Sequence, residues 1–185
     1  MGTSILRLSA ALTIAASSSC SAIAAAPMAR AHESDGPRFA HVAISVADLD
    51  AMRTWYQTRL ELPTVVERFQ LPDPPVRTVI LEGASGLRVE LIERKGGSRL
   101  RTFKDPLDAA SSHGYTHFAL EVNDLDGAYR LLSVHGGTGV WPPGPAVQPG
   151  SRFAYVKDPE GNLIELIQLP KVHRRAGASA ARGCW

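Results

Sequence analysis

The segment His41-Val-Ala-Ile-Ser-Val-Ala-Asp-Leu-Asp50 decides the fold, because the chain contains it twice. The second copy is His117-Phe-Ala-Leu-Glu-Val-Asn-Asp-Leu-Asp126, which is identical at six of ten positions and begins 76 residues later. Another segment, Gly86-Leu-Arg-Val-Glu-Leu-Ile-Glu93, matches Gly161-Asn-Leu-Ile-Glu-Leu-Ile-Gln168 at four of eight positions and an offset of 75. Two separate matches at nearly the same offset indicate a duplicated module.

The first copy has the pattern of a strand, a helix and three further strands. Residues 39–46 alternate between an aliphatic and a mixed face, as a half-buried strand does. Asp48 is a favourable N-cap for a helix over 49–60 with an apolar stripe, and Pro63 prevents its continuation. Strand-like runs then cover 64–69, 77–82 and 87–94, with Pro and Gly turn signals between them. This predicts a βαβββ module over about residues 39–94.

The second copy repeats the order over about residues 115–169. Its expected elements are a strand over 115–122, a helix over 125–135 capped by Asp124, and strands over 138–141, 152–156 and 162–168. The proline-rich stretch 141–145 is predicted as a surface loop, and 95–114 as a connection with room for a short helix. The predicted fold is therefore α+β, with two tandem βαβββ modules in a domain over 36–170.

Composition limits the partners and the compartment. The net charge is only +2, and the basic tail 171–185 has no interleaved aromatic residues, so a small-molecule partner is expected rather than nucleic acid. Residues 1–31 have the layout of a secretory signal peptide and are too short and polar for a stable membrane span, which predicts export. The alternative is a cytoplasmic protein that starts at Met28. Removal of the leader would take Cys20 with it and leave Cys184 without an intramolecular disulfide partner.

The repeated histidines and glutamates are the candidate chemical groups. His41 and His117 lie opposite the aliphatic face of the first strand of each module, and Glu90 and Glu165 interrupt apolar last strands. A buried carboxylate needs a cation, a hydrogen-bond network or solvent. Two imidazoles and two carboxylates suit one divalent ion such as Zn²⁺, Ni²⁺, Co²⁺, Mn²⁺ or Fe²⁺. A single strand histidine or glutamate would be an ordinary surface residue, but here the same two types recur at equivalent positions.

These motifs, with Gly114-Tyr-Thr-His117-Phe-Ala-Leu and Tyr155-Val-Lys-Asp-Pro-Glu-Gly-Asn-Leu-Ile-Glu165-Leu, resemble the vicinal-oxygen-chelate superfamily over residues 39–169. That superfamily includes glyoxalase I, methylmalonyl-CoA epimerase, extradiol dioxygenases and antibiotic-resistance proteins. The resemblance implies a cup-like, U-shaped mixed sheet in which His41, Glu90, His117 and Glu165 hold one metal ion. It also implies, by analogy, a homodimer.

The complete His-Glu-His-Glu set most resembles bacterial glyoxalase I. The resemblance implies a lyase or isomerase that acts through a metal-stabilised enediolate, with Glu165, and Glu90 as its partner, moving a proton between adjacent carbons. The sequence departs from the family's glutathione-binding pattern, with Ser45 in place of an arginine and Arg94 in place of an asparagine. The candidate substrate-binding residues are therefore Arg88, Arg94, Arg152 and Tyr155.

Other branches remain as alternatives. A non-catalytic drug-binding protein has the same cup but typically lacks the metal ligands. The epimerase branch usually has glutamine at the position of Glu90. An extradiol dioxygenase would use His41, His117 and Glu165, but the histidine expected shortly before Tyr155 is missing. An antibiotic-modifying transferase is a further alternative.

Overall fold

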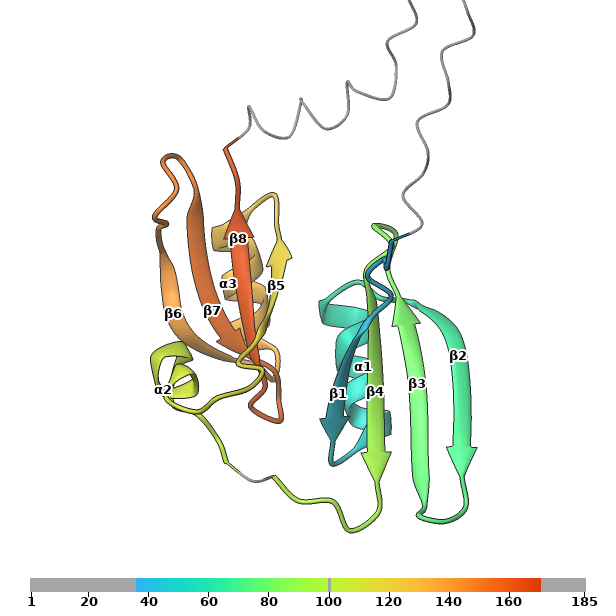
Figure 1. The fold of residues 1–185 in the computed structure, drawn as a ribbon. Coiled ribbons are helices and arrows are strands. Elements are labelled where there is room, and N and C mark those ends of the chain that lie inside the picture. Colours follow the sequence, from blue (N-terminus) through green and yellow to red (C-terminus); the bar gives the residue numbers. More distant parts are fainter. Residues whose placement is uncertain (1–35, 100, 171–185) are drawn as a thin grey trace, which may run out of the picture. The chain divides into compact units, whose positions relative to one another are not determined.

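The computed structural model describes residues 36–99 and 101–170, and its elements belong to one compact unit that begins at Phe39 (Figure 1). The first module contains β1 (Val42–Val46), α1 (Leu49–Arg59), β2 (Thr64–Leu71), β3 (Val76–Glu82) and β4 (Arg88–Arg94). The predicted leader 1–31 and the basic tail 171–185 lie outside the described residues. No helix in the described part of the chain has the length and apolar character needed to cross a membrane.

The second module repeats the first. It contains β5 (Phe118–Glu121), α3 (Leu125–Val134), β6 (Thr138–Pro145), β7 (Arg152–Lys157) and β8 (Leu163–Gln168). The short helix α2 (Pro106–Ala110) lies in the connection between the modules, where the sequence left room for one. The predicted α+β class and the two βαβββ modules are confirmed.

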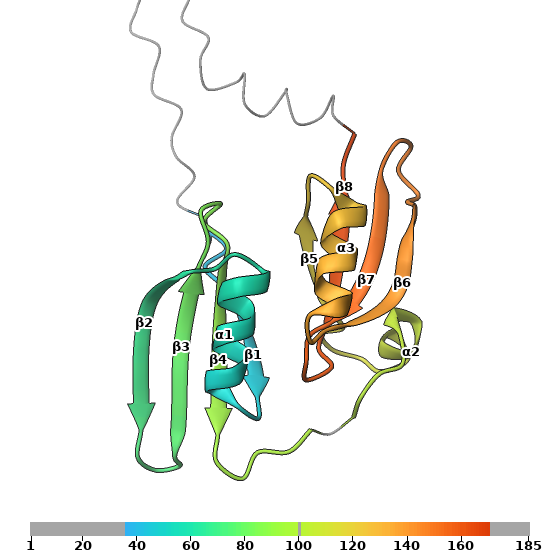
Figure 2. The same cartoon turned by 180° about the vertical axis from the view of Figure 1, so that it is seen from behind.

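Each module forms a four-stranded mixed sheet with the same strand order. The orders are β1-β4-β3-β2 and β5-β8-β7-β6, and in each sheet only the first two strands are parallel. One helix covers one face of each sheet, as Figure 2 shows for α1 and α3. Buried apolar residues between helix and sheet form the core, including Met52 and Tyr56 on α1 and Leu132 on α3. The opposite face of each sheet is left for the candidate site.

Equivalent local interactions shape both copies. The carboxylates of Asp48 and Asp124 accept backbone N–H groups in the first turns of α1 and α3, as N-caps do. The turns before β4 and β8 are also alike, with Gly86 and Gly161 at φ values of +80° and +87°. Such values suit glycine because a Cβ atom would be strained there. The duplication seen in the sequence is therefore also a duplication of caps and turns.

The prediction of a surface loop over 141–145 was wrong, because β6 runs through this stretch to Pro145. Proline lacks the N–H group that an interior strand must donate on one of its sides. In the order β5-β8-β7-β6, β6 is an edge strand and pairs only with β7. Its register also shifts between Gly139 and Trp141 and again between Trp141 and Gly144. An edge position and bulges allow proline in a strand.

Contacts between the modules come from the end of β1 and from α1. The Tyr56 hydroxyl donates to the buried Asp158 carboxylate at 2.9 Å, and Trp55 Nε1 donates to the His135 carbonyl at 2.8 Å. The Glu160 carboxylate accepts the N–H groups of Ala47 and Asp48 at 2.8 to 3.0 Å. The turn that leads into β8 is therefore held by groups of the first module.

Candidate metal centre

The four candidate ligands form two His–Glu pairs, one in each module. His41 Nε2 lies 3.1 Å from Glu90 Oε2. His117 Nε2 lies 3.1 Å from Glu165 Oε2. The two modules therefore place the same atoms at the same separation.

The parallel strand pair at the edge of each sheet sets this geometry. Ala43 on β1 lies opposite Glu90 on β4, and Ala119 on β5 lies opposite Glu165 on β8. Each histidine stands two residues before that alanine, so it lies on the same face of the sheet as the glutamate. The face is the one that α1 or α3 does not cover. The alternation in the sequence predicted this face correctly.

All four side chains are partly withdrawn from water. The exposed fractions are 13% and 19% for the glutamates Glu90 and Glu165, and 35% and 24% for the histidines His41 and His117. A carboxylate with so little exposure needs a positive or hydrogen-bonding partner. A protonated imidazole or a metal ion between the two side chains could meet this need.

The pairs fit a divalent ion in donor type and in spacing. An ion bonded to imidazole nitrogen and carboxylate oxygen at about 2.1 Å holds neighbouring donor atoms about 3.0 Å apart in octahedral geometry and about 3.4 Å apart in tetrahedral geometry. Both His–Glu separations are 3.1 Å, which is close to the octahedral spacing and is also the distance of a direct hydrogen bond. However, among the described residues no group of three or more His, Cys, Asp or Glu side chains gathers around one point. A site of all four residues stays a prediction.

The pair in the second module has two additional partners. The Thr116 hydroxyl is 2.9 Å from His117 Nδ1, and the Tyr155 hydroxyl is 3.4 Å from His117 Nε2. If Nδ1 carries the proton and donates it to Thr116, Nε2 has a free lone pair facing Glu165. That tautomer is the one that binds a metal through Nε2.

Tyr155 also interacts with Glu165, which is its cross-strand neighbour on β8. Burial, the Glu165 charge and a hydrogen bond to that carboxylate raise the pKa of Tyr155 to about 12. The phenol is therefore protonated at neutral pH and can donate a hydrogen bond.

Aromatic rings surround Tyr155 on the same sheet. Its ring meets His117 edge to face, with centroids 5.1 Å apart. Trp141 on β6 and Phe153 on β7 pack against it in the same manner, at 5.4 Å and 5.9 Å. Such pairs favour one orientation of each ring. The Tyr155 hydroxyl is therefore held beside His117 and Glu165.

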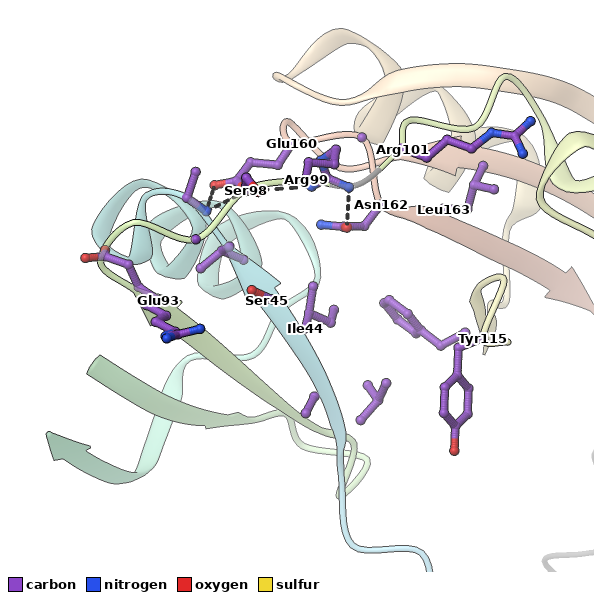
Figure 3. Close-up of a pocket in the computed structure, with 18 of the residues that line it drawn as sticks. Ile44, Ser45, Glu93, Ser98, Arg99, Arg101, Tyr115, Glu160, Asn162 and Leu163 are labelled. Carbon is purple, nitrogen blue, oxygen red and sulfur yellow. Dashed lines mark hydrogen bonds and ion pairs between the residues drawn. The ribbon is translucent and has the colours of Figure 1, made fainter. Parts of the chain in front are cut away.

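A cavity of about 1290 Å³ adjoins both histidines. It is bordered by β1, by parts of the connection after β4, and by residues 160–163 (Figure 3). Arg99, labelled in that view, donates to the Asn162 side chain at 3.2 Å and pairs with Glu160. The cavity is large enough for a small-molecule substrate.

The three predicted substrate-binding arginines differ in their surroundings. Arg94 lines the cavity beside Lys95, and in the described part of the chain neither side chain has a hydrogen bond or ion pair. Arg88 pairs with Glu82 across the β3–β4 ladder. Arg152 forms two hydrogen bonds with Asp126, and in the first module Arg77 forms three with Asp50 and Glu93. Arg94 is therefore the arginine of the three that is available to an anion in the cavity.

Sequence reasoning missed Thr116 and Phe153 as part of this site. The sequence marks such positions by a difference between the two copies rather than by a residue that both copies share. Ala40 precedes His41 where Thr116 precedes His117, and Ile80 lies opposite Glu90 where Tyr155 lies opposite Glu165.

Comparisons with known proteins agree with this architecture. The family model described as Glyoxalase/Bleomycin resistance protein/Dioxygenase superfamily matches residues 38–166. A lactoylglutathione lyase of Arabidopsis thaliana is 31% identical over 137 residues, which are 72% of this chain and 45% of that protein. The chain spans about half the length of the curated relatives it matches.

Solved structures share the fold. A glyoxalase family protein from Bacillus cereus aligns with a TM-score of 0.59 at 21% identity. The alignment covers 76% of this chain and 99% of the Bacillus cereus protein. A fosfomycin resistance protein from Listeria monocytogenes aligns with a TM-score of 0.52 at 18% identity, covering 75% of this chain and 98% of its own. At these identities the likeness shows the fold alone.

Proposed function

Because the chain belongs to the Glyoxalase/Bleomycin resistance protein/Dioxygenase superfamily, we propose that it is a metal-dependent lyase or isomerase of the glyoxalase I type. The observation that supports this proposal is the repeated His–Glu pair, with the same 3.1 Å separation in both modules. The relatives named lactoylglutathione lyase support the reaction type. The alternative of a metal-free drug-binding protein gives no role to two matched pairs of this kind.

In this proposal His41, Glu90, His117 and Glu165 hold one divalent ion, drawn from Zn²⁺, Ni²⁺, Co²⁺, Mn²⁺ and Fe²⁺. The ion would stabilise negative charge that develops on the substrate oxygens. Glu165, with Glu90 as its partner, takes a proton from one carbon of the substrate and returns it to the neighbouring carbon. Arg94 holds a negatively charged group of the substrate in the cavity.

The proposal includes a homodimer in which each metal centre combines pairs from two chains. Each His–Glu pair offers only two protein donors, and no larger group gathers within the described residues. A second copy of the chain would bring the missing pair to each centre. Its two-fold symmetry would then make two equal centres per dimer.

Mixing of two inactive variants tests this arrangement. One chain carries His41→Ala with Glu90→Ala, and the other carries His117→Ala with Glu165→Ala. If each centre uses two chains, the mixed dimer regains one intact centre out of two, together with half of the bound metal. If each centre lies within one chain, mixing restores neither metal nor activity.

The reaction itself is tested on the metal-loaded protein with hemithioacetals of several thiols, followed by ultraviolet absorbance of the thioester product. Turnover that Arg94→Ala weakens mainly through a higher KM would support the proposal. Tight binding of an antibiotic without turnover of any hemithioacetal would favour the drug-binding alternative.

A further inference from the structure

The two His–Glu pairs have equal spacing but different support. In the second module, Thr116 contacts Nδ1 of His117, while Tyr155 hydrogen-bonds the Glu165 carboxylate and packs its ring edge to face against His117. In the first module, Ala40 and Ile80 stand at the equivalent positions and have no polar side-chain atom. The pair His41–Glu90 therefore lacks both orienting contacts.

Tyr155 is itself fixed in place. Its side chain is buried, with a relative exposure of 7%. Trp141 and Phe153 contact its ring from β6 and from the same strand. The position equivalent to Phe153 in the first module is Thr78, whose buried hydroxyl has no hydrogen-bond partner. Among the described residues, packed aromatic rings therefore lie behind the histidine and glutamate of the second module, and the pair of the first module has no such ring contact.

We propose that Thr116 and Tyr155 are positioning residues that hold His117 and Glu165 ready for the ion, so that the second module anchors the metal and the first module completes its coordination. This inference rests on the proposed function, because it assumes that the four residues bind a metal ion. It adds that the two modules contribute unequally to metal binding.

The physical reason is the conformational freedom that a ligand loses on binding. A glutamate or histidine that turns freely must give up its rotamers when it coordinates, whereas one already held by a hydrogen bond loses less. Hydrogen-bonding partners behind metal ligands change metal affinity by about 10- to 100-fold. The second module has such partners, and the first has none among its described residues. The metal affinities of the two His–Glu pairs should therefore differ by a factor of this size.

The test is a titration of the full-length, metal-free protein with Co²⁺, followed by the visible absorption bands of the bound ion. Tyr155→Phe and Thr116→Val are compared with the wild type. Tyr129→Phe serves as the matched control, since Tyr129 packs partly buried on α3 away from the site. Near-ultraviolet circular dichroism of each variant reports whether its tertiary structure is intact.

We expect Tyr155→Phe to lower Co²⁺ affinity about tenfold and to shift the absorption bands, with Thr116→Val acting in the same direction. The control should match the wild type in both measurements. Wild-type affinity and an unchanged spectrum in both Tyr155→Phe and Thr116→Val would overturn this inference while leaving the four-ligand proposal intact. A wild type that binds no Co²⁺ would overturn both. If Tyr155→Phe fails to fold, the result for Thr116→Val decides.

Discussion

The buried aromatic residues of the two modules lie in different elements. In the first module they lie on α1, where Trp55 and Tyr56 stand at the positions of Leu131 and Leu132 in the second. In the second module the buried aromatic residue is Tyr155 on the sheet, where Phe153 and Tyr155 replace Thr78 and Ile80 of the first. The copies keep the same His–Glu pair, but the residues around it have diverged.

The same difference appears in the turn before the last strand. The second module has Asp158 and Glu160 there, and both carboxylates accept hydrogen bonds from the first module. The first module has Gly83 and Ser85 at these positions. A Cβ atom at Gly83 would lie 2.9 Å from Leu62, so that turn has no room for a larger residue without movement. The second copy thus carries both the carboxylates that hold the two modules together and the residues that support the site.

The largest expected effect concerns metal binding by the two halves. Loss of the second pair, through His117→Ala with Glu165→Ala, should abolish detectable metal binding. Loss of the first pair, through His41→Ala with Glu90→Ala, should leave weak binding to the pre-oriented pair. Isothermal titration with Zn²⁺ measures both affinities. Equal losses in the two double variants would show that the halves are equivalent.

The next effect is on stability. Tyr56→Phe removes a hydrogen bond to the buried Asp158 carboxylate and should lower the free energy of unfolding by about 1.5–3 kcal/mol. Urea denaturation followed by fluorescence measures the change, with Tyr129→Phe as a control. An unchanged denaturation midpoint would mean that this contact between the modules contributes nothing measurable.

The candidate ligands and the contact between Tyr56 and Asp158 mark the limit of what the sequence could predict. The repeat at offsets of 76 and 75 predicted the modules, and strand alternation predicted that each histidine shares a face with a glutamate. The separation of the four residues into two pairs depends on how the modules meet, which a strand pattern does not contain. The contact between Tyr56 and Asp158, which lie 102 residues apart, depends on the same arrangement.

A smaller effect is expected from transfer of the supporting residues to the first module. Ala40→Thr with Ile80→Tyr places a hydroxyl before His41 and a phenol opposite Glu90. If metal binding by the first module is limited by poor orientation of His41 and Glu90, metal affinity should rise by about threefold to tenfold. The gain should be largest in a chain that already lacks His117 and Glu165. No gain in either background would indicate that these residues act only in their native surroundings.

The smallest effect concerns acid stability and one unequal position, Glu93 in the first module and Gln168 in the second. Hydrogen bonds from Arg77 and from the Leu49 N–H hold the pKa of Glu93 below its ordinary value of 4.5. A pKa that is lower in the folded protein than in the unfolded chain stabilises the fold at pH values above the ordinary pKa. This stabilisation is lost as the pH falls through the lowered pKa. For this partly exposed group it amounts to about 0.5–1 kcal/mol.

Glu93→Gln makes the first module resemble the second, where Gln168 accepts the Leu125 N–H. The variant should be slightly less stable at pH 7, and its stability should depend less on pH below about 4.5. Thermal unfolding at a series of pH values measures this slope. A variant with the same slope as the wild type would assign the acid dependence to other carboxylates.

The proline-rich edge strand shows a different limit of sequence reasoning. A Trp-Pro-Pro-Gly-Pro run is typical of loops because proline cannot donate to a sheet. In the structure this run forms the end of β6. Proline is tolerated there because, within the described residues, no strand pairs with the outer side of β6. Edge position is a property of the assembled sheet, and a local pattern cannot contain it.

The most direct test of the central claim is the metal content of the purified protein, measured by mass spectrometry with elemental detection after supply of Zn²⁺, Ni²⁺, Co²⁺, Mn²⁺ and Fe²⁺. The account predicts about one divalent ion per chain, reduced by Glu90→Gln and more strongly by Glu165→Gln. A protein that retains no ion, or one whose metal content neither substitution changes, would contradict it.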